Sequence, residues 1–190
     1  MTDPDGVIRA AEEVAGILES RGIGTVVIGA VALAAHGYVR LTEDLDLGVN
    51  TDLDTLRRVA ETLRSAGFDV ELREPDGQDP LGGVIDVRGP FGLVQIVNYG
   101  GRFPAVIDAG VAAADTVIRA GSRLRIVPLP HLVALKLYAG GTKSRADIVE
   151  LLSHNPDADV AAIRDLCRGW RLRGLDPLID EAAGGRPGQA

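Results

Sequence analysis

The segment from Val26 to Val49 restricts the fold more than any other part of the chain. Its second half, Asp44-Leu45-Asp46-Leu47, alternates carboxylates with leucines. Strand side chains point alternately to the two faces of a sheet, so the leucines enter the core while Asp44 and Asp46 share the other face. Two carboxylates at this spacing repel each other unless a proton or a cation lies between them. The pattern predicts a divalent-cation site, and oxygen ligands favour Mg²⁺ or Mn²⁺.

Gly29 lies between an apolar strand and an alanine-rich helix. Glycine lets another group approach the backbone closely. A helix that begins at Ala30 directs its free N–H groups and the positive end of its dipole to the same place. The turn therefore predicts a bound phosphate next to the carboxylates.

Asp86 is the candidate for a third carboxylate. It interrupts an apolar strand, Val84-Ile85-Asp86-Val87, where a charge is costly without a partner. Alternatively, it is an edge-strand carboxylate that faces water. Because the chain also contains Asp44 and Asp46, we expect Asp86 to join them in one metal site.

Hydrophobic periodicity and turn residues divide the chain into an α/β part and a helical part. Helices are predicted at 5–20, 30–36, 52–66, 103–114, 130–138, 143–152 and 155–168, with a last one near Pro177. Strands are predicted at 25–28, 44–49, 68–72, 84–87, 93–97, 116–118 and 124–127. We expect an α/β (α+β) core over residues 1–128, a C-terminal helical subdomain over 129–185 and a disordered tail over 186–190.

The composition indicates a protein of the cytoplasm. The N-terminus is acidic, no uncharged apolar run reaches 18 residues, and Cys167 is the single cysteine; these features exclude a signal peptide, a membrane helix and an internal disulfide. The net charge of −7 argues against a surface that coats nucleic acid. Residues 1–95 hold 8 Lys/Arg and 17 Asp/Glu, whereas residues 96–190 hold 12 and 10. This asymmetry is either a solvated acidic face or a second half that faces an anion held by the first.

The motif spacing resembles a known signature. Gly29-Ala30, thirteen further residues and then Asp44-Leu45-Asp46-Leu47 resemble the motif of the DNA polymerase β-like nucleotidyltransferase superfamily. The run from His36 to Asp46 is similar to small bacterial members that include the AbiEii-type toxins of toxin–antitoxin systems. Segments 129–137 (LPHLVALKL) and 143–148 (KSRADI) are similar to a second block of that branch. The resemblance covers roughly residues 24–152.

The resemblance implies a mixed central sheet with helices on one face. It also implies Mg²⁺-dependent transfer of a nucleoside monophosphate from an NTP to a hydroxyl acceptor, with pyrophosphate leaving. The acceptor could be tRNA, a protein side chain or a small molecule such as an antibiotic, and a toxin would have a cognate antitoxin as partner. The implied catalytic metal ligands are Asp44, Asp46 and Asp86. The implied nucleotide contacts are Gly29, Ala30, Arg40, Thr42, Lys136 and Lys143, and Asp147 matches an acidic position of the second block.

Other interpretations stay open at this point. Ala30 replaces a second Gly or Ser of the signature and lacks a hydroxyl donor, which favours a catalytically inactive module that binds a nucleotide or a protein partner. A sugar-nucleotide glycosyltransferase could use Asp-x-Asp, although it does not require Gly29 at this distance. Arg40 could pair with a phosphate or with Glu43, and Lys136 could be solvated. Lys143 could pair with Asp147 one helical turn away.

Overall fold

The computed structural model describes residues 4–42, 44–76 and 80–184. Within these ranges the chain forms a mixed α+β fold. The strands are β1 (Thr25–Ile28), β2 (Asp44–Val49), β3 (Asp69–Arg73), β4 (Val84–Gly89) and β5 (Gly92–Asn98). The helices are α1 (Pro4–Glu19), α2 (Gly29–Ala35), α3 (Leu53–Ser65), α4 (Pro104–Ala113), α5 (Leu129–Ala139), α6 (Gly141–His154), α7 (Val160–Gly169) and α8 (Asp176–Gly184).

The five strands form one sheet in the order β1-β2-β5-β4-β3. The β2 and β5 strands are parallel and the other neighbours are antiparallel, which confirms the mixed sheet. The register places Asp46 opposite Gln95, and Gln95 opposite Asp86. Because paired residues point to the same side of a sheet, these three side chains lie in one row across one face.

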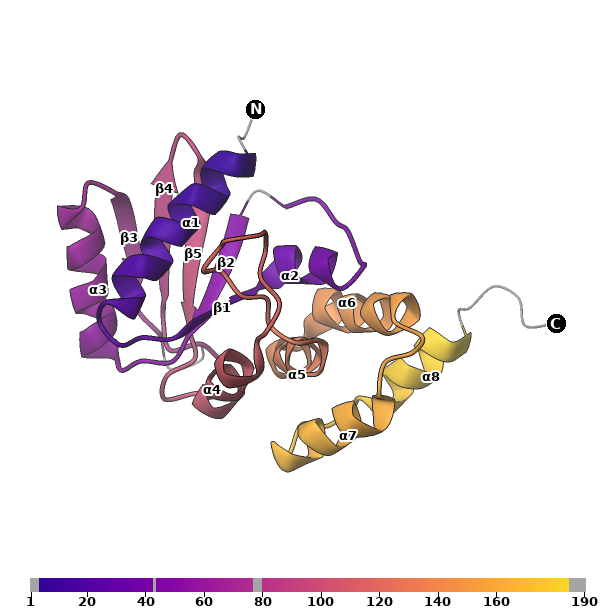
Figure 1. Ribbon diagram of the computed structural model, residues 1–190. Coiled ribbons are helices and arrows are strands. Elements are labelled where there is room, and N and C mark those ends of the chain that lie inside the picture. Colours follow the sequence, from indigo (N-terminus) through magenta and orange to yellow (C-terminus); the bar gives the residue numbers. More distant parts are fainter. Residues whose placement is uncertain (1–3, 43, 77–79, 185–190) are drawn as a thin grey trace.

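The opposite face of the sheet carries the core. Leu45 and Leu47 are fully buried, as the alternation predicted, and each contributes about 1.5–3 kcal/mol by burial. Helix α1 packs on β2 and β5 while α3 packs on β3, and both helices lie on the same side of the sheet (Figure 1). Since the leucines of β2 point toward these helices, Asp44 and Asp46 must point away from them.

The two short strands predicted at 116–118 and 124–127 do not form strands of the sheet. This segment makes only isolated bridges, in which Val27 pairs with Ile126 and Val117 with Arg125. The Val27 N–H donates to the Arg125 carbonyl at 2.7 Å. Too few residues lie between the preceding turn and Pro128 for a longer ladder, so the segment only covers the outer edge of β1.

The helix predicted from residue 155 begins later, at Val160. The Asp159 side chain caps it by accepting a hydrogen bond from Ala162 N at 2.9 Å. The Asn155 amide is used elsewhere, since it donates to the carbonyls of His36 at 2.7 Å and Leu151 at 2.8 Å. Asn155 therefore ties the end of α6 to the end of α2.

Helices α5 to α8 lie together beyond the β1 edge of the sheet, with α7 and α8 farthest from it (Figure 1). Helix α5 packs on α4, α6 and α7, and α6 packs on α8. The helical composition predicted after residue 128 is thus observed, while the predicted tail at 186–190 lies outside the described residues. None of the described helices is both long and apolar enough to span a membrane.

Asn98 provides a test of the sheet. Its amide is fully buried, donates to the carbonyls of Thr51 and Gly82, and accepts from the N–H groups of Thr51 and Gly100, each at 3.0 Å. We expect Asn98→Ala to lower the free energy of unfolding by about 2–4 kcal/mol, because several buried backbone groups lose their partner. The measurement is urea denaturation followed by circular dichroism. The matched variant Asn50→Ala removes one exposed hydrogen bond to Asp108 and should cost under about 1 kcal/mol; equal losses would contradict this role.

Candidate active site

The Asp46 carboxylate lies directly against the backbone of Gly29. Gly29 has φ +65°, and a Cβ atom built on it would lie 1.7 Å from Asp46 Oδ2. The antiparallel pairing of β1 and β2 produces this contact, because it places Ile28 opposite Asp46. A side chain at position 29 would both adopt a left-handed conformation and occupy the space of the carboxylate. The glycine is therefore required by Asp46 as well as by the turn.

Asp44 lies two residues before Asp46 on the same strand and faces the same side. The Thr42 hydroxyl donates a hydrogen bond to Asp44 Oδ1, which fixes the orientation of that carboxylate. Both aspartates line an open cleft with a volume of about 580 Å³. The other residues lining this cleft are Gly29, Arg40, Leu41, Thr42, Gln95, Lys136 and Lys143. The structure thus brings together most of the residues predicted from the sequence.

The paired carboxylates create a local excess of negative charge. Burial raises the pKa of the Asp46 carboxyl to about 6, and the negative charge of Asp44 adds to this effect. Lys136, Arg40 and Lys143 act in the opposite direction. A carboxylate that is desolvated and faces a second carboxylate is stabilised by a bound cation.

A buried carboxylate holds two of these cationic side chains. Asp147 is 2% exposed and accepts a hydrogen bond from Lys136 Nζ at 2.6 Å. Its other oxygen lies 3.6 Å from Arg40 Nε. Arg40 Nε is itself buried without a hydrogen-bond partner in the described part of the protein. Asp147 thus faces α5 and the loop after α2, so its partners are Lys136 and Arg40 and not Lys143, the alternative left open by the sequence.

Lys143 and Ala30 differ in how they relate to the cleft. Lys143 is exposed on the first turn of α6 and lines the cleft near Asp44 and Asp46. The Ala30 side chain is 3% exposed and lines neither the cleft nor the neighbouring chamber described below. Ala30 is the second residue of α2, so only its backbone N–H, and not its side chain, could contribute to phosphate binding.

Asp86 is kept apart from the aspartate pair. Strand β5 lies between β4 and β2, and Gln95 occupies the intervening position. Asp86 Oδ1 accepts from Arg73 at 2.9 Å and from Gln95 Nε2 at 2.7 Å, and its Oδ2 accepts from Arg88 at 2.8 Å. For Asp86 to ligate a metal, as predicted, these groups would have to release it. In the ranges 4–42, 44–76 and 80–184, no three His, Cys, Asp or Glu side chains are grouped so that they could hold a metal ion.

Asp44 and Asp46 nevertheless suit a hard divalent cation. They present carboxylate oxygens from one strand face into an open cleft, and the raised pKa of Asp46 reflects charge that a cation would neutralise. Mg²⁺ is commonly held by one or two carboxylates together with waters and substrate phosphates. The donor set therefore fits Mg²⁺ or Mn²⁺ bound jointly with a phosphorylated ligand.

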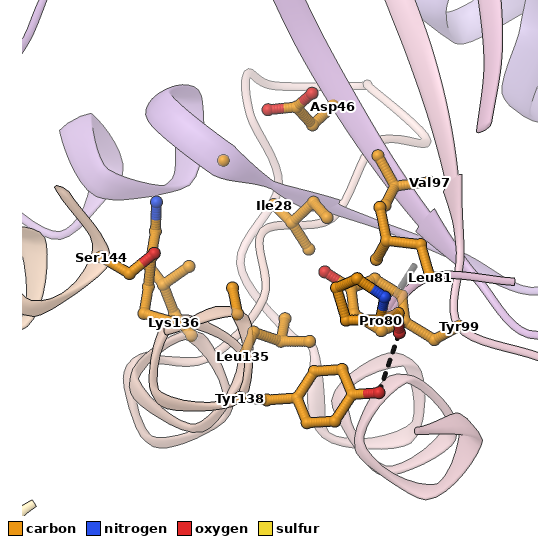
Figure 2. A pocket seen from close by; sticks show the side chains of 13 residues that line it. Ile28, Asp46, Pro80, Leu81, Val97, Tyr99, Leu135, Lys136, Tyr138 and Ser144 are labelled. Carbon is orange, nitrogen blue, oxygen red and sulfur yellow. Dashed lines mark hydrogen bonds between the residues drawn. The ribbon is translucent and has the colours of Figure 1, made fainter. Parts of the chain in front are cut away.

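A second, apolar chamber opens from the cleft. It has a volume of about 230 Å³ and shares Gly29, Asp46 and Lys136 with the cleft. Figure 2 shows Asp46 and the Lys136 ammonium group at one end of this chamber and Tyr99 and Tyr138 at the other. The site therefore consists of a charged part and an apolar part that meet at Asp46.

The architecture is similar to that of solved nucleotidyltransferase-like proteins. An antigenic nucleotidyltransferase-like protein from Paracoccidioides brasiliensis matches with a TM-score of 0.56 at 17% identity, over 96% of this chain and 94% of that one. The antibiotic-resistance factor ANT(2'')-Ia matches with a TM-score of 0.54 at 15% identity, over 89% of this chain and 93% of that one. No protein-family model and no curated protein sequence matches the chain. The chain has a nucleotidyltransferase-like fold.

Within the nucleotidyltransferase-like fold, three side chains near the site were not predicted from the sequence. Gln95 could have been noticed as the single polar residue of an apolar strand. Tyr99 and Tyr138 gave no signal, because they become neighbours only when α5 packs against the end of β5. Asp147 was predicted to belong to the second block, but the sequence did not indicate its partner Lys136.

Gly29→Ala tests the contact with Asp46. The added methyl group would displace the carboxylate and force a left-handed conformation on alanine, so we expect a loss of at least about 2 kcal/mol in the free energy of unfolding. Gly121→Ala is the matched control, because Gly121 has φ +77° with nothing within 4 Å of the added atom; it should cost only about 1 kcal/mol. Urea denaturation measures both variants. Equal losses would mean that the carboxylate makes no steric demand.

The raised pKa of Asp46 predicts a pH-dependent stability. Its folded-state pKa of about 6 exceeds the value of about 3.9 for an unfolded chain, so the folded state binds the proton more tightly. The contribution of Asp46 to stability is therefore fully present below about pH 4 and is lost as the pH rises through about 6. With EDTA, Asp46→Asn should be more stable than the parent by about 2–3 kcal/mol at pH 7.5 and equal to it near pH 4.

The control for this measurement is Asp165→Asn, because the Asp165 side chain is 78% exposed on α7. Its stability relative to the parent should change little between the two pH values. The raised pKa would be contradicted if the free energy of unfolding differed between Asp46→Asn and the parent by the same amount at pH 4 and at pH 7.5.

Proposed function

We propose that this protein is a metal-dependent nucleotidyltransferase, which moves a nucleoside monophosphate from an NTP to a hydroxyl acceptor. The observation that carries the proposal is the convergence of the Asp44–Asp46 pair with Lys136, Lys143 and Arg40 in one open cleft. Carboxylates for a divalent cation and cations for phosphates are the two requirements of phosphoryl transfer. The nucleotidyltransferase-like fold supports the same reaction class.

The cleft residues have distinct roles in this proposal. Asp44 and Asp46 hold Mg²⁺ or Mn²⁺, with Thr42 orienting Asp44. The bound metal neutralises charge on the triphosphate and on the leaving pyrophosphate. Lys143, exposed at the cleft, binds a phosphate. Lys136 lies next to Asp46 and contributes positive charge there while Asp147 fixes its position.

The proposed reaction is an in-line displacement at the α-phosphorus. The acceptor oxygen forms a bond to this phosphorus as the bond to the bridging oxygen breaks, and pyrophosphate leaves. The hydroxyl proton passes to a carboxylate of the site. Asp86, predicted as the third carboxylate of the site, is the natural candidate for this step. Both of its oxygens, however, already accept hydrogen bonds from Arg73, Arg88 and Gln95.

The acceptor and the biological role extend the proposal beyond the fold. We infer a tRNA hydroxyl as the first acceptor to test, and a toxin role with a cognate antitoxin, on the resemblance of the segment from His36 to Asp46 to AbiEii-type sequences. Two large apolar side chains near the cleft, Val39 (78% exposed) and Leu41 (100% exposed), offer a contact surface for a macromolecule. ANT(2'')-Ia is an antibiotic-resistance factor, so small-molecule acceptors belong in the same test.

A second candidate function is nucleotide binding without catalysis. The separation of Asp86 from the aspartate pair by β5 favours it, because the pair then lacks the third carboxylate that usually takes the proton. An inactive module would still bind a metal–nucleotide complex through Asp44 and Asp46. Both candidates therefore predict binding of a metal–nucleotide complex, and only the first predicts transfer of a nucleoside monophosphate.

Label transfer distinguishes them. The protein is incubated with Mg²⁺ and each α-labelled NTP, alone, with total tRNA and with aminoglycosides. We expect transfer to one acceptor, and a decrease of about 100-fold or more in Asp46→Asn because the metal loses a ligand. Asp165→Asn serves again as the exposed control and should retain activity.

Asp86→Asn then tests the predicted third carboxylate. If Asp86 takes the proton, this variant binds NTP normally and loses transfer by about 100-fold. If Asp86 only holds Arg73 and Arg88, transfer persists while the protein loses about 1–2 kcal/mol of stability. Metal-dependent NTP binding without transfer to any acceptor would favour the inactive module, and the absence of NTP binding would contradict both candidates.

A further inference from the structure

The apolar chamber beside the cleft has no role in the reaction described so far. Its walls combine the end of the sheet with helix α5, through Ile28, Val97, Leu132, Leu135 and Tyr138. Its volume of about 230 Å³ is below the range of about 300–1,000 Å³ for sites that hold drug-sized ligands. The chamber therefore suits a single ring system rather than a whole substrate.

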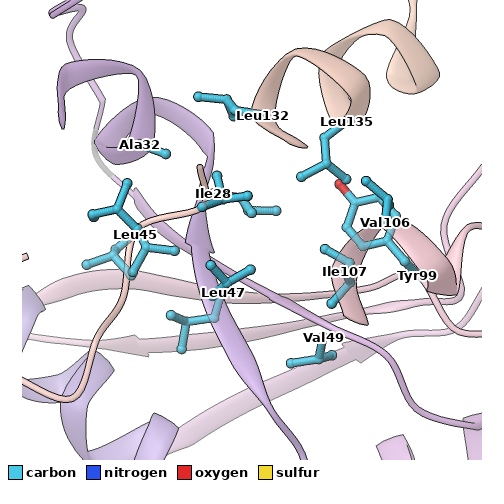
Figure 3. Packing of buried hydrophobic residues seen from close by; sticks show 14 of the residues in the cluster. Ile28, Ala32, Leu45, Leu47, Val49, Tyr99, Val106, Ile107, Leu132 and Leu135 are labelled. Atoms are coloured by element: carbon cyan, nitrogen blue, oxygen red, sulfur yellow. The ribbon is translucent and has the colours of Figure 1, made fainter. Parts of the chain in front are cut away.

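Tyr99 places one polar atom inside this apolar space. The residue is only 6% exposed, and burial raises the pKa of its hydroxyl well above the usual value. The Tyr99 ring lies 6.5 Å from the Tyr138 ring between centroids, and its hydroxyl has no hydrogen-bond partner in the part of the chain that the structure describes. Figure 3 shows the hydroxyl directed toward Leu135, which itself lines the chamber. Because Tyr99 lines the chamber, a ligand there can hydrogen-bond to this hydroxyl, and a ligand with a matching polar atom would be bound selectively.

The opposite wall is held in place by Tyr138. Its hydroxyl donates to the Pro80 carbonyl at 2.8 Å, and its ring stacks on Phe103 with a centroid separation of 4.5 Å. The dashed line in Figure 2 marks the hydrogen bond to Pro80. Because both the ring and the hydroxyl are fixed, the chamber is formed before a ligand enters.

We propose that the chamber binds the heterocyclic base of the nucleotide, and that the Tyr99 hydroxyl determines base preference by hydrogen bonding to its polar edge. This inference rests on the proposed function. The chamber and the charged cleft meet at Asp46 and Lys136, so a nucleotide can place its phosphates in the cleft and its base in the chamber. The part of the cleft of about 580 Å³ that the phosphates do not fill is left for the acceptor.

Direct binding tests the inference without relying on turnover. Isothermal titration calorimetry with Mg²⁺ compares ATP, GTP, CTP and UTP with inorganic tripolyphosphate, which has no base. We expect the preferred NTP to bind about tenfold or more tightly than tripolyphosphate, because the base removes apolar surface from water. Tyr99→Phe should change the ratio of affinities between bases by about 5- to 10-fold, because one hydrogen bond is lost.

Ala139 allows the chamber to be filled with little risk to folding. It lines the chamber and is exposed at the end of α5. We expect Ala139→Phe to reduce NTP affinity to that of tripolyphosphate while tripolyphosphate binding stays unchanged. Ala161→Phe, at an exposed alanine of α7 that lines neither the chamber nor the cleft, is the matched control and should bind NTP like the parent.

The possible results are distinguishable. If Ala139→Phe binds NTP normally, the base lies elsewhere and the inference is overturned; a loss of transfer in that variant would then assign the chamber to the acceptor. Equal affinities for all NTPs and tripolyphosphate would also overturn it. If neither NTP nor tripolyphosphate binds in the presence of Mg²⁺, the proposed function fails, and this inference fails with it.

Discussion

The contact between the Asp46 carboxylate and the backbone of Gly29 is the constraint on which the site depends. The antiparallel pairing of β1 with β2 brings the first turn of α2 under the carboxylate. Any side chain at position 29 would occupy that space. The chain therefore places a buried negative charge at the point where a strand becomes a helix, and the cleft residues around it have to compensate for that charge.

Compensation comes from two lysines of the helical half of the chain and from Arg40 in the α/β part. Lys136 on α5, Lys143 on α6 and Arg40 in the loop after α2 all lower the pKa that burial and Asp44 raise. Asp147 prevents two of these cations from collapsing onto the aspartate pair, because it binds Lys136 and lies near Arg40. The charged groups thus line one cleft of about 580 Å³.

Asp86 illustrates a different use of a carboxylate on the same sheet face. It lies in the same row as Asp46, but Gln95 separates the two and two arginines bind its oxygens. A buried carboxylate that is already paired with arginines has its charge neutralised, whereas an unpaired carboxylate is stabilised by a bound cation. The two aspartates therefore differ in their partners, and the variants Asp46→Asn and Asp86→Asn separate the chemical role from the structural one.

The sequence by itself determined the alternation of β2, the position of Gly29 and the order of the helices and strands of the core, because these depend on local periodicity and on glycine conformation. It did not determine which carboxylates share a site. That depends on strand order, and the position of β5 between β2 and β4 separates Asp86 from the aspartate pair. Nor could it assign Lys136 to Asp147 or form the chamber around Tyr99. These contacts join different elements of the fold, so they were decided by the packing of α5 against α6 and beside the end of the sheet.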